Sequence, residues 1–127
     1  MANGAANRNR FFKTKWFLRE ARKALISDEE LCSAMRQVLL GQAVDLGGGV
    51  FKKRLGRNQF RSIILAKGGR NWVYEYIFAK KDRDNISNRE LVEFRKLARS
   101  YEGLTDQEVD ELIVNRDWVE ICNGDSA

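Results

Sequence analysis

Cationic side chains are concentrated between residues 52 and 83, where ten Lys and Arg residues accompany only two carboxylates, Glu75 and Asp82. This segment has a net charge of +8, whereas the whole chain has +5. Residues 84–127 have a net charge of −6. Holding so many like charges on one folded surface is unfavourable unless an anion offsets their repulsion. The pattern therefore predicts an anionic partner, most commonly the phosphodiester backbone of a nucleic acid.

Three of these cations lie on adjacent predicted strands. Lys52 and Arg54 share one face of a strand because side chains alternate along it. Arg61 lies near the start of the next strand, and Lys80 and Lys81 follow the third. If the hairpins pair in register, these side chains converge on one patch. The alternative is that they are solvated charges that block edge pairing, but the scarcity of carboxylates in this stretch favours a binding patch.

Such a patch suits phosphoryl transfer within RNA. The attack of a 2′-hydroxyl on the adjacent phosphorus places negative charge on the non-bridging oxygens, and Arg binds these oxygens with a planar fork. The chain has no His, so acid–base chemistry falls to other groups, and a Lys among other cations can act as the base. Lys52, Arg54 and Arg61 are the candidates. Composition alone leaves open whether the patch cleaves RNA or only binds it.

Other residues of the same region are candidate RNA contacts. The cations among them are Lys53, Arg57, Lys80 and Arg83. Four aromatic residues share one parity along the strand at residues 71–79: Trp72, Tyr74, Tyr76 and Phe78. They form either one layer of the core or a platform for stacked bases. Core packing is favoured for most of them, and Tyr74 and Tyr76 are the candidates for base stacking.

Hydrophobic spacing and turn residues predict the order βααβββαα. The strands are expected at residues 10–13, 50–55, 59–67 and 71–79, and the helices at 15–25, 27–40, 88–101 and 105–114. Capping boxes begin three of the helices, at Ser27, Ser87 and Thr105. The two hairpins predict a small antiparallel sheet of three to five strands packed against helices, which is an α+β fold. The closing WVEIC segment either adds an edge strand or packs on the core.

The remaining features describe one intracellular domain. Residues 1–9 are expected to be a disordered tail and residues 10–127 a single domain. The AVDLGGGV segment is expected to be irregular, and its glycines favour a tight connection over a phosphate cradle because no helix follows them. Neither a signal peptide nor an apolar run of about 20 residues is present. Cys32 and Cys122 are therefore expected to be reduced thiols in a cytoplasmic protein.

Three segments in order resemble a known family. They are FFKTKWFLREARK, DLGGGVFKKRLGRNQFRSIILAKGG and YIFAKKDRDNIS followed by a helix. Over about residues 10–121 the chain resembles the RelE/HigB superfamily of bacterial toxins. The resemblance implies a RelE-like fold and the toxin of a type II toxin–antitoxin pair, which enters the ribosome and cuts messenger RNA without a metal or other cofactor. It also implies a tightly bound cognate antitoxin with a helix-turn-helix domain.

The resemblance also assigns roles to residues of this chain. Lys52 matches the position of the general base, and Arg54, Arg61 and Lys81 match the cations that clamp the scissile phosphate. The family's base-stacking Tyr has no counterpart here, since residues 84–87 read DNIS. Two alternatives remain beside the nuclease. One is a non-enzymatic inhibitor of DNA gyrase, because ParE toxins share this fold, and the other is a passive RNA-binding module.

Overall fold

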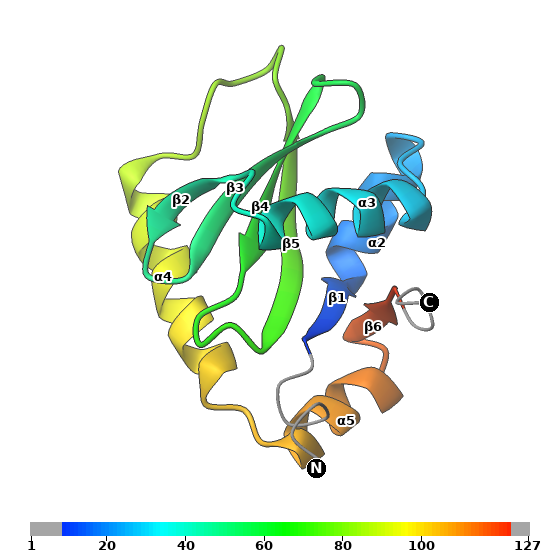
Figure 1. Ribbon diagram of the computed structural model, residues 1–127, viewed down its shortest axis with the longest axis vertical. Helices are drawn as coiled ribbons and strands as arrows, with labels where there is room; N and C mark the ends of the chain where they lie inside the picture. Colours follow the sequence, from blue (N-terminus) through cyan, green and yellow to red (C-terminus); the bar gives the residue numbers. More distant parts are fainter. Residues whose placement is uncertain (1–8, 123–127) are drawn as a thin grey trace.

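The computed structural model describes residues 9–122 and shows one β-sheet with helices on both sides (Figure 1). The strands are β1 (Arg10–Thr14), β2 (Val44–Gly47), β3 (Val50–Leu55), β4 (Phe60–Leu65), β5 (Asn71–Ala79) and β6 (Trp118–Ile121). The helices are α2 (Lys15–Lys23), α3 (Asp28–Leu39), α4 (Asn88–Glu102) and α5 (Asp106–Val114). The predicted α+β class is confirmed. None of the helices in the described part of the chain is long and apolar enough to cross a membrane.

The sheet is larger than predicted and is mixed rather than antiparallel. Its strand order is β2-β3-β4-β5-β1-β6. β1 runs parallel to β5, and every other neighbouring pair is antiparallel. The AVDLGGGV segment, expected to be irregular, contains β2, which pairs with β3. The WVEIC segment forms the edge strand β6 beside β1.

The last residue of the predicted tail, Asn9, contacts the sheet. Residues 1–8 lie outside the described part of the chain. Asn9, expected to be disordered, instead accepts a hydrogen bond at 3.2 Å from the indole N–H of Trp72. The next residue, Arg10, begins β1 and donates to both carboxylate oxygens of Glu120 on β6 at 2.8 and 2.9 Å. These contacts hold the start of β1 between β5 and β6.

Local capping fixes where the helices begin. Ser87 with Glu90 and Thr105 with Glu108 form the two reciprocal bonds of a capping box, as predicted. The third predicted box is only half formed, because Ser27 accepts from the Glu30 amide but Glu30 points elsewhere. Its carboxylate accepts a hydrogen bond at 2.5 Å from the amide of Gly56, in the β3–β4 loop. Glu30 therefore ties α3 to the hairpin that carries the central cations.

A bulge in β5 switches side chains between the two faces of the sheet. Ile63 of β4 pairs with Tyr76, but the next residue, Ile64, pairs with Tyr74, so Glu75 is the extra residue. Tyr74 consequently packs under α2 and α3, whereas Tyr76 and Phe78 pack under α4. The expectation that the four aromatic residues of β5 share one face was wrong, because alternation holds only where pairing is regular.

The glycines at residues 47–49 form a tight connection between β2 and β3. All three have positive φ, between 66° and 84°. Arg95 of α4 lies against them and donates to the carbonyl oxygens of Leu46 and Gly47. The Gly47 amide donates to the Asp45 carboxylate at 2.8 Å. These contacts favour the structural role expected from the sequence over a phosphate cradle.

Gly49→Ala should lower the free energy of unfolding by about 2–4 kcal/mol. A Cβ at Gly49 would lie 2.5 Å from the Cβ and 2.6 Å from the Cα of Lys67, so backbone would have to move. Gly69 is the matched control, because it also has positive φ (69°) but its Cβ would meet nothing within 4 Å. Urea unfolding should therefore show a clearly larger loss for Gly49→Ala than for Gly69→Ala. Equal losses would contradict the steric account.

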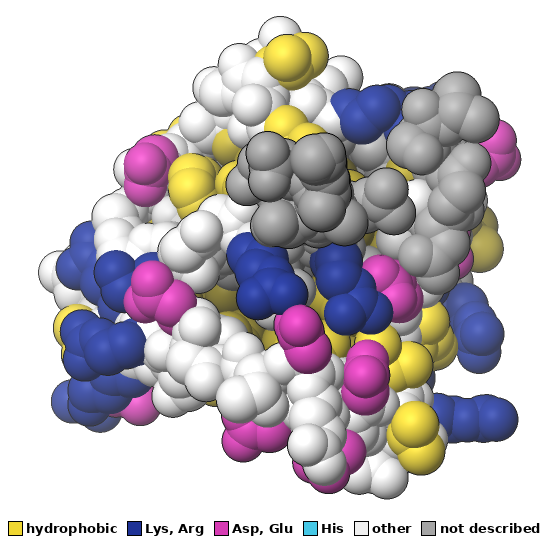
Figure 2. Space-filling model, turned by 60° about the horizontal axis from the view of Figure 1, so that its bottom comes forward, with side chains coloured by type: hydrophobic (Ala, Val, Ile, Leu, Met, Phe, Trp, Pro, Cys, Tyr) yellow, Lys and Arg dark blue, Asp and Glu magenta, His cyan; other side chains and the backbone are white. Residues whose placement is uncertain are grey.

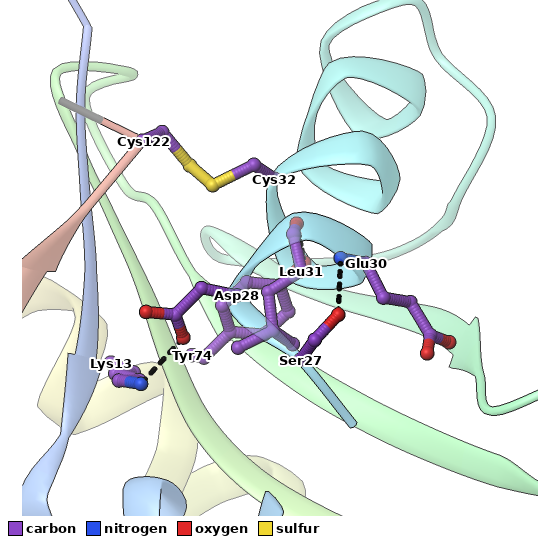
Figure 3. The surroundings of a disulfide bond; sticks show 8 residues. All are labelled: Lys13, Ser27, Asp28, Glu30, Leu31, Cys32, Tyr74 and Cys122. Atoms are coloured by element: carbon purple, nitrogen blue, oxygen red, sulfur yellow. Dashed lines mark hydrogen bonds and ion pairs between the residues drawn. A yellow bond between two sulfur atoms is a disulfide. The ribbon is translucent and has the colours of Figure 1, made fainter. Parts of the chain in front are cut away.

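Cys32 and Cys122 form a disulfide, so the expectation of two reduced thiols was wrong. The bond joins buried Cys32 on α3 to the residue that follows β6, and Figure 3 shows the two side chains meeting between these elements. The two residues are 90 positions apart in the sequence. Their pairing depends on the packing of α3 over the sheet beside β1 and β6, and a local sequence pattern does not contain that information.

Candidate functional site

Strand register brings three of the predicted cations together. Arg54 on β3 lies directly opposite Arg61 on β4, and Lys52 lies two pairs further along, opposite Ile63. Directly opposite residues have Cβ atoms about 5 Å apart. All three side chains share the parity of residues packed under α4, Val50 on β3 and Ile63 on β4. They therefore occupy one face of the sheet, and we call Lys52, Arg54 and Arg61 the cationic row.

The charge of the cationic row is not neutralised within the described residues. There, Lys52 and Arg54 have no ion pair and no side-chain hydrogen bond. The guanidinium of Arg61 donates to the carbonyl oxygens of Asn58 and Phe60, both at 3.1 Å, which orients it without cancelling its charge. Arg54 is exposed, and the other two are half-buried. Because their mutual repulsion has no counterion here, the row favours a bound anion.

Cations at the opposite end of the molecule behave differently. The row lies toward the β3–β4 turn, at the top of Figure 1, whereas α5 lies at the bottom. Figure 2 brings that lower end forward and shows basic and acidic side chains close together. Two ion pairs belong to it: Arg70 with Asp106 at 2.5 Å and Arg10 with Glu120 at 2.8 Å. The acidic C-terminal third therefore neutralises cations near α5, while the row keeps its charge.

Two of the predicted RNA contacts point away from the cationic row. Lys53 lies on the opposite face of β3, and its Nζ donates to the carbonyl oxygen of Gln42 at 2.9 Å. Burial, and then the charge of Arg54, lower the pKa of Lys53. Tyr74 is completely buried, and its hydroxyl donates to the carbonyl oxygen of Leu31 at 2.7 Å. Both side chains lie on the face of the sheet opposite the cationic row, and Tyr74 has no exposed ring on which a base could stack.

Three other predicted contacts gather in a hollow of about 600 Å³ at the tip of the molecule. Arg57 reaches it from the β3–β4 loop, and Lys80 and Lys81 reach it from the connection between β5 and α4. Asp84 is the carboxylate in its lining. In the described part of the chain these three cations have no ion pair. We call this cavity the tip hollow, and it extends the positive surface beyond the end of the sheet.

Arg83 and Tyr76 lie on the side of the cationic row. Arg83 donates to both carboxylate oxygens of Glu90, at 2.5 and 3.2 Å, and its guanidinium lies 5.4 Å from the centre of the Phe78 ring. The Arg83 pair and the Ser87 cap hold the pKa of Glu90 at about 2. Tyr76 is half-buried and stacks on Trp16 of α2 with ring centres 5.3 Å apart. Trp16 and Glu90 were not among the predicted site residues. Glu90 was predictable from its place in the capping box after Arg83.

Glu75, the bulged residue of β5, should make stability depend on pH. Burial raises its pKa from 4.5 to about 7, although a hydrogen bond from the Tyr101 hydroxyl, at 2.7 Å, opposes the rise. The folded state therefore holds this proton more tightly than the unfolded chain. The resulting stability is complete below about pH 4.5 and is lost as pH rises through 7.

Glu75→Gln should raise the free energy of unfolding at pH 8 by about 3 kcal/mol, because the amide needs no proton to remain neutral. Urea unfolding at pH 5 and pH 8 measures the effect, and the difference between the two pH values should shrink in the variant. Glu102→Gln is the control, since it removes the same charge from an exposed position. An unchanged pH dependence in Glu75→Gln would contradict this account.

The comparison with known families identifies the family to which this fold belongs. A family model described as "RelE toxin of RelE / RelB toxin-antitoxin system" matches residues 9–121. No curated protein and no solved structure gives a significant match. The matched span contains the six strands and four helices of the described residues, and with them the cationic row. The chain belongs to the RelE family of toxins from toxin–antitoxin systems.

Proposed function

We propose that this toxin is an endoribonuclease that cleaves messenger RNA on the ribosome and so arrests translation and growth. The single observation that carries the proposal is the cationic row, three side chains from two paired strands with no counterion in the described residues. RelE toxins generally inhibit translation, which agrees with this chemistry. A gyrase inhibitor would have no need for such a row, and a passive RNA-binding module would not need its charges on a single phosphate.

In the proposed reaction Lys52 acts as the base. Its amine accepts the proton of a ribose 2′-hydroxyl while that oxygen attacks the adjacent phosphorus. The bond from phosphorus to the 5′-oxygen of the next nucleotide breaks, and that oxygen takes up a proton from solvent and leaves. Lys52 returns its proton to solvent, so the proton count balances. The products are a 2′,3′-cyclic phosphate and a free 5′-hydroxyl, so no water is consumed in this step. No atom changes its oxidation state, so no oxidant or reductant takes part.

Arg54 and Arg61 stabilise the transition state of this step. Negative charge develops on the non-bridging phosphate oxygens, and a guanidinium offers parallel N–H donors that match them. The two side chains are directly opposite in register, so both can face one phosphate. Lys81, with Lys80 and Arg57 in the tip hollow, binds the phosphates of neighbouring nucleotides in this proposal. Arg83 forms an ion pair with Glu90, and its guanidinium lies over the ring of Phe78.

The proposed partners follow from the family and from the reaction. Membership of the family implies a cognate antitoxin, and we propose that it has a helix-turn-helix domain and binds the toxin tightly in the cytoplasm. The ribosome and its message are the proposed target.

Mapping of message ends after induction in living cells tests the activity. Wild-type protein should produce new 5′ ends within translated codons soon after induction, together with translation arrest. Lys52→Ala, expressed at the same level, is the matched control and should produce none. Intact messages with signs of DNA damage would instead indicate a gyrase inhibitor. Intact messages with neither effect, and RNA binding that falls steeply with salt, would indicate a passive module.

A further inference from the structure

A second hollow lies along the part of β5 that has no neighbouring strand on one side. β1 pairs with β5 only from Asn71 to Tyr74, because β1 ends at Thr14 and the chain continues into α2. The rest of β5 therefore faces α2 across a hollow of about 450 Å³. We call it the edge hollow. Its volume lies within the range of pockets that bind small molecules.

The lining of the edge hollow includes three aromatic residues and has no net charge. The aromatic residues are Phe60, Tyr76 and Phe78, and the remaining apolar ones are Ala24, Ile77 and Ala79. Its charged residues are two carboxylates and two cations, which balance: Glu20, Asp82, Lys23 and Arg83. Such a lining suits a flat, uncharged aromatic group better than a phosphate or an acidic peptide, because a net charge would find no excess of the opposite sign.

The edge hollow lies beside the cationic row. Phe78 pairs directly with Arg61, and Tyr76 pairs directly with Ile63, the partner of Lys52. A ligand with a phosphate on the row therefore has this hollow one strand away. Arg83 lies over Phe78 and is fixed by Glu90, and Tyr76 is backed by Trp16 and by Phe94 of α4. These supports hold the aromatic wall in place before any ligand binds.

We propose that the edge hollow binds a nucleobase of the RNA whose phosphate lies on the cationic row. The inference rests on the proposed function and adds the place where the substrate base is held. Base–aromatic packing against Tyr76 provides the affinity, and Arg83 closes the hollow next to Phe78. In this arrangement the base held here contributes to the choice of the cleaved nucleotide. The row supplies the chemistry, and the hollow supplies the selectivity.

The first test separates base binding from phosphate binding in the full-length protein. The probes are the four nucleoside 5′-monophosphates and ribose 5-phosphate, which lacks a base, titrated while side-chain NMR signals are followed. At least one nucleotide should shift the ring signals of Tyr76 and Phe78 and bind at least fivefold more tightly than ribose 5-phosphate. Ribose 5-phosphate should shift only the signals of the cationic row. Ring signals that no nucleotide shifts would overturn the proposal.

Variants give the second test. Tyr76→Leu and Arg83→Gln should each abolish the advantage of the nucleotide over ribose 5-phosphate. Arg83 is a rim residue, so its variant remains informative if Tyr76→Leu lowers the melting temperature. Arg89→Gln, which removes the same charge from an exposed position on α4, is the control and should keep the advantage. Retention of the advantage in Arg83→Gln and in a folded Tyr76→Leu would overturn the proposal.

These arms also distinguish the two proposals. If ribose 5-phosphate leaves the signals of Lys52, Arg54 and Arg61 unchanged, the phosphate site fails, and with it the proposed nuclease. If ribose 5-phosphate shifts the signals of the cationic row but no nucleotide binds more tightly than it does, only the proposal for the edge hollow is contradicted. In cleavage assays Tyr76→Leu should change which nucleotides are cut, whereas Lys52→Ala should slow cleavage at every site alike.

Discussion

Alanine at Lys52, Arg54 or Arg61 should slow message cleavage by about 10²–10³-fold and relieve growth arrest. Arg54→Ala and Arg61→Ala each remove a charge from the place where the transition state becomes more negative, and Lys52→Ala removes the proposed base. A single group in either role typically contributes that much. Folding should persist, because the row has no ion pair in the described residues that its loss would break. The melting temperature should stay the same or rise slightly, since repulsion within the row decreases.

The measurements are single-turnover cleavage on programmed ribosomes, growth after induction, and the melting temperature of each variant. Arg99→Ala, which removes an exposed cation from α4, is the control and should remain fully toxic. Arg61→Lys should retain only part of the activity, because an ammonium group lacks the planar pair of donors. Ordinary toxicity in all three alanine variants would remove the assigned roles.

Reduction of the Cys32–Cys122 disulfide should give the largest change in stability. The bond closes a loop of 90 residues, and loss of such a crosslink lowers the free energy of unfolding by about 3–5 kcal/mol in the chain-entropy model. For a domain of this size the melting temperature should fall by more than about 10 °C. The proposed cytoplasmic location is reducing, and under that proposal the acting protein would lack this crosslink and have the lower stability.

Calorimetry with and without a thiol reductant measures this effect. Cys122→Ser should melt near the temperature of the reduced wild type, and the reductant should then change nothing further. This control separates the loss of the bond from any other effect of the reductant. Equal melting temperatures of oxidised and reduced wild type would show that the crosslink leaves stability unchanged.

Local interactions made much of the fold predictable from the sequence. The Ser87–Glu90 and Thr105–Glu108 pairs begin α4 and α5 as expected, because a capping box depends only on residues three positions apart. The central strands followed from hydrophobic runs bounded by glycine-containing loops. The face shared by Lys52 and Arg54 followed from strand alternation, which β3 obeys because its pairing with β4 has no bulge.

The errors arose where distant segments decide the structure. Aromatic residues recur at every second position of β5 without interruption, from Trp72 to Phe78. Nothing local therefore marks Glu75 as the bulged residue that separates Tyr74 from Tyr76. β2 was missed because its short VDLG segment runs into two further glycines and becomes a strand only by pairing with β3. The disulfide depends on the approach of segments 90 residues apart. The edge hollow likewise needs the end of β1, the turn into α2 and the β5–α4 connection together.

A double-mutant cycle on Arg54 and Arg61 tests most directly whether the row acts on one phosphate. The measurement is the single-turnover rate of message cleavage on programmed ribosomes for the wild type, Arg54→Ala, Arg61→Ala and the double variant. If both arginines clamp the same phosphate as a unit, the double variant should lose little more activity than either single variant. Losses that multiply, to about 10⁴-fold or more, would place the two arginines at independent contacts and contradict the account.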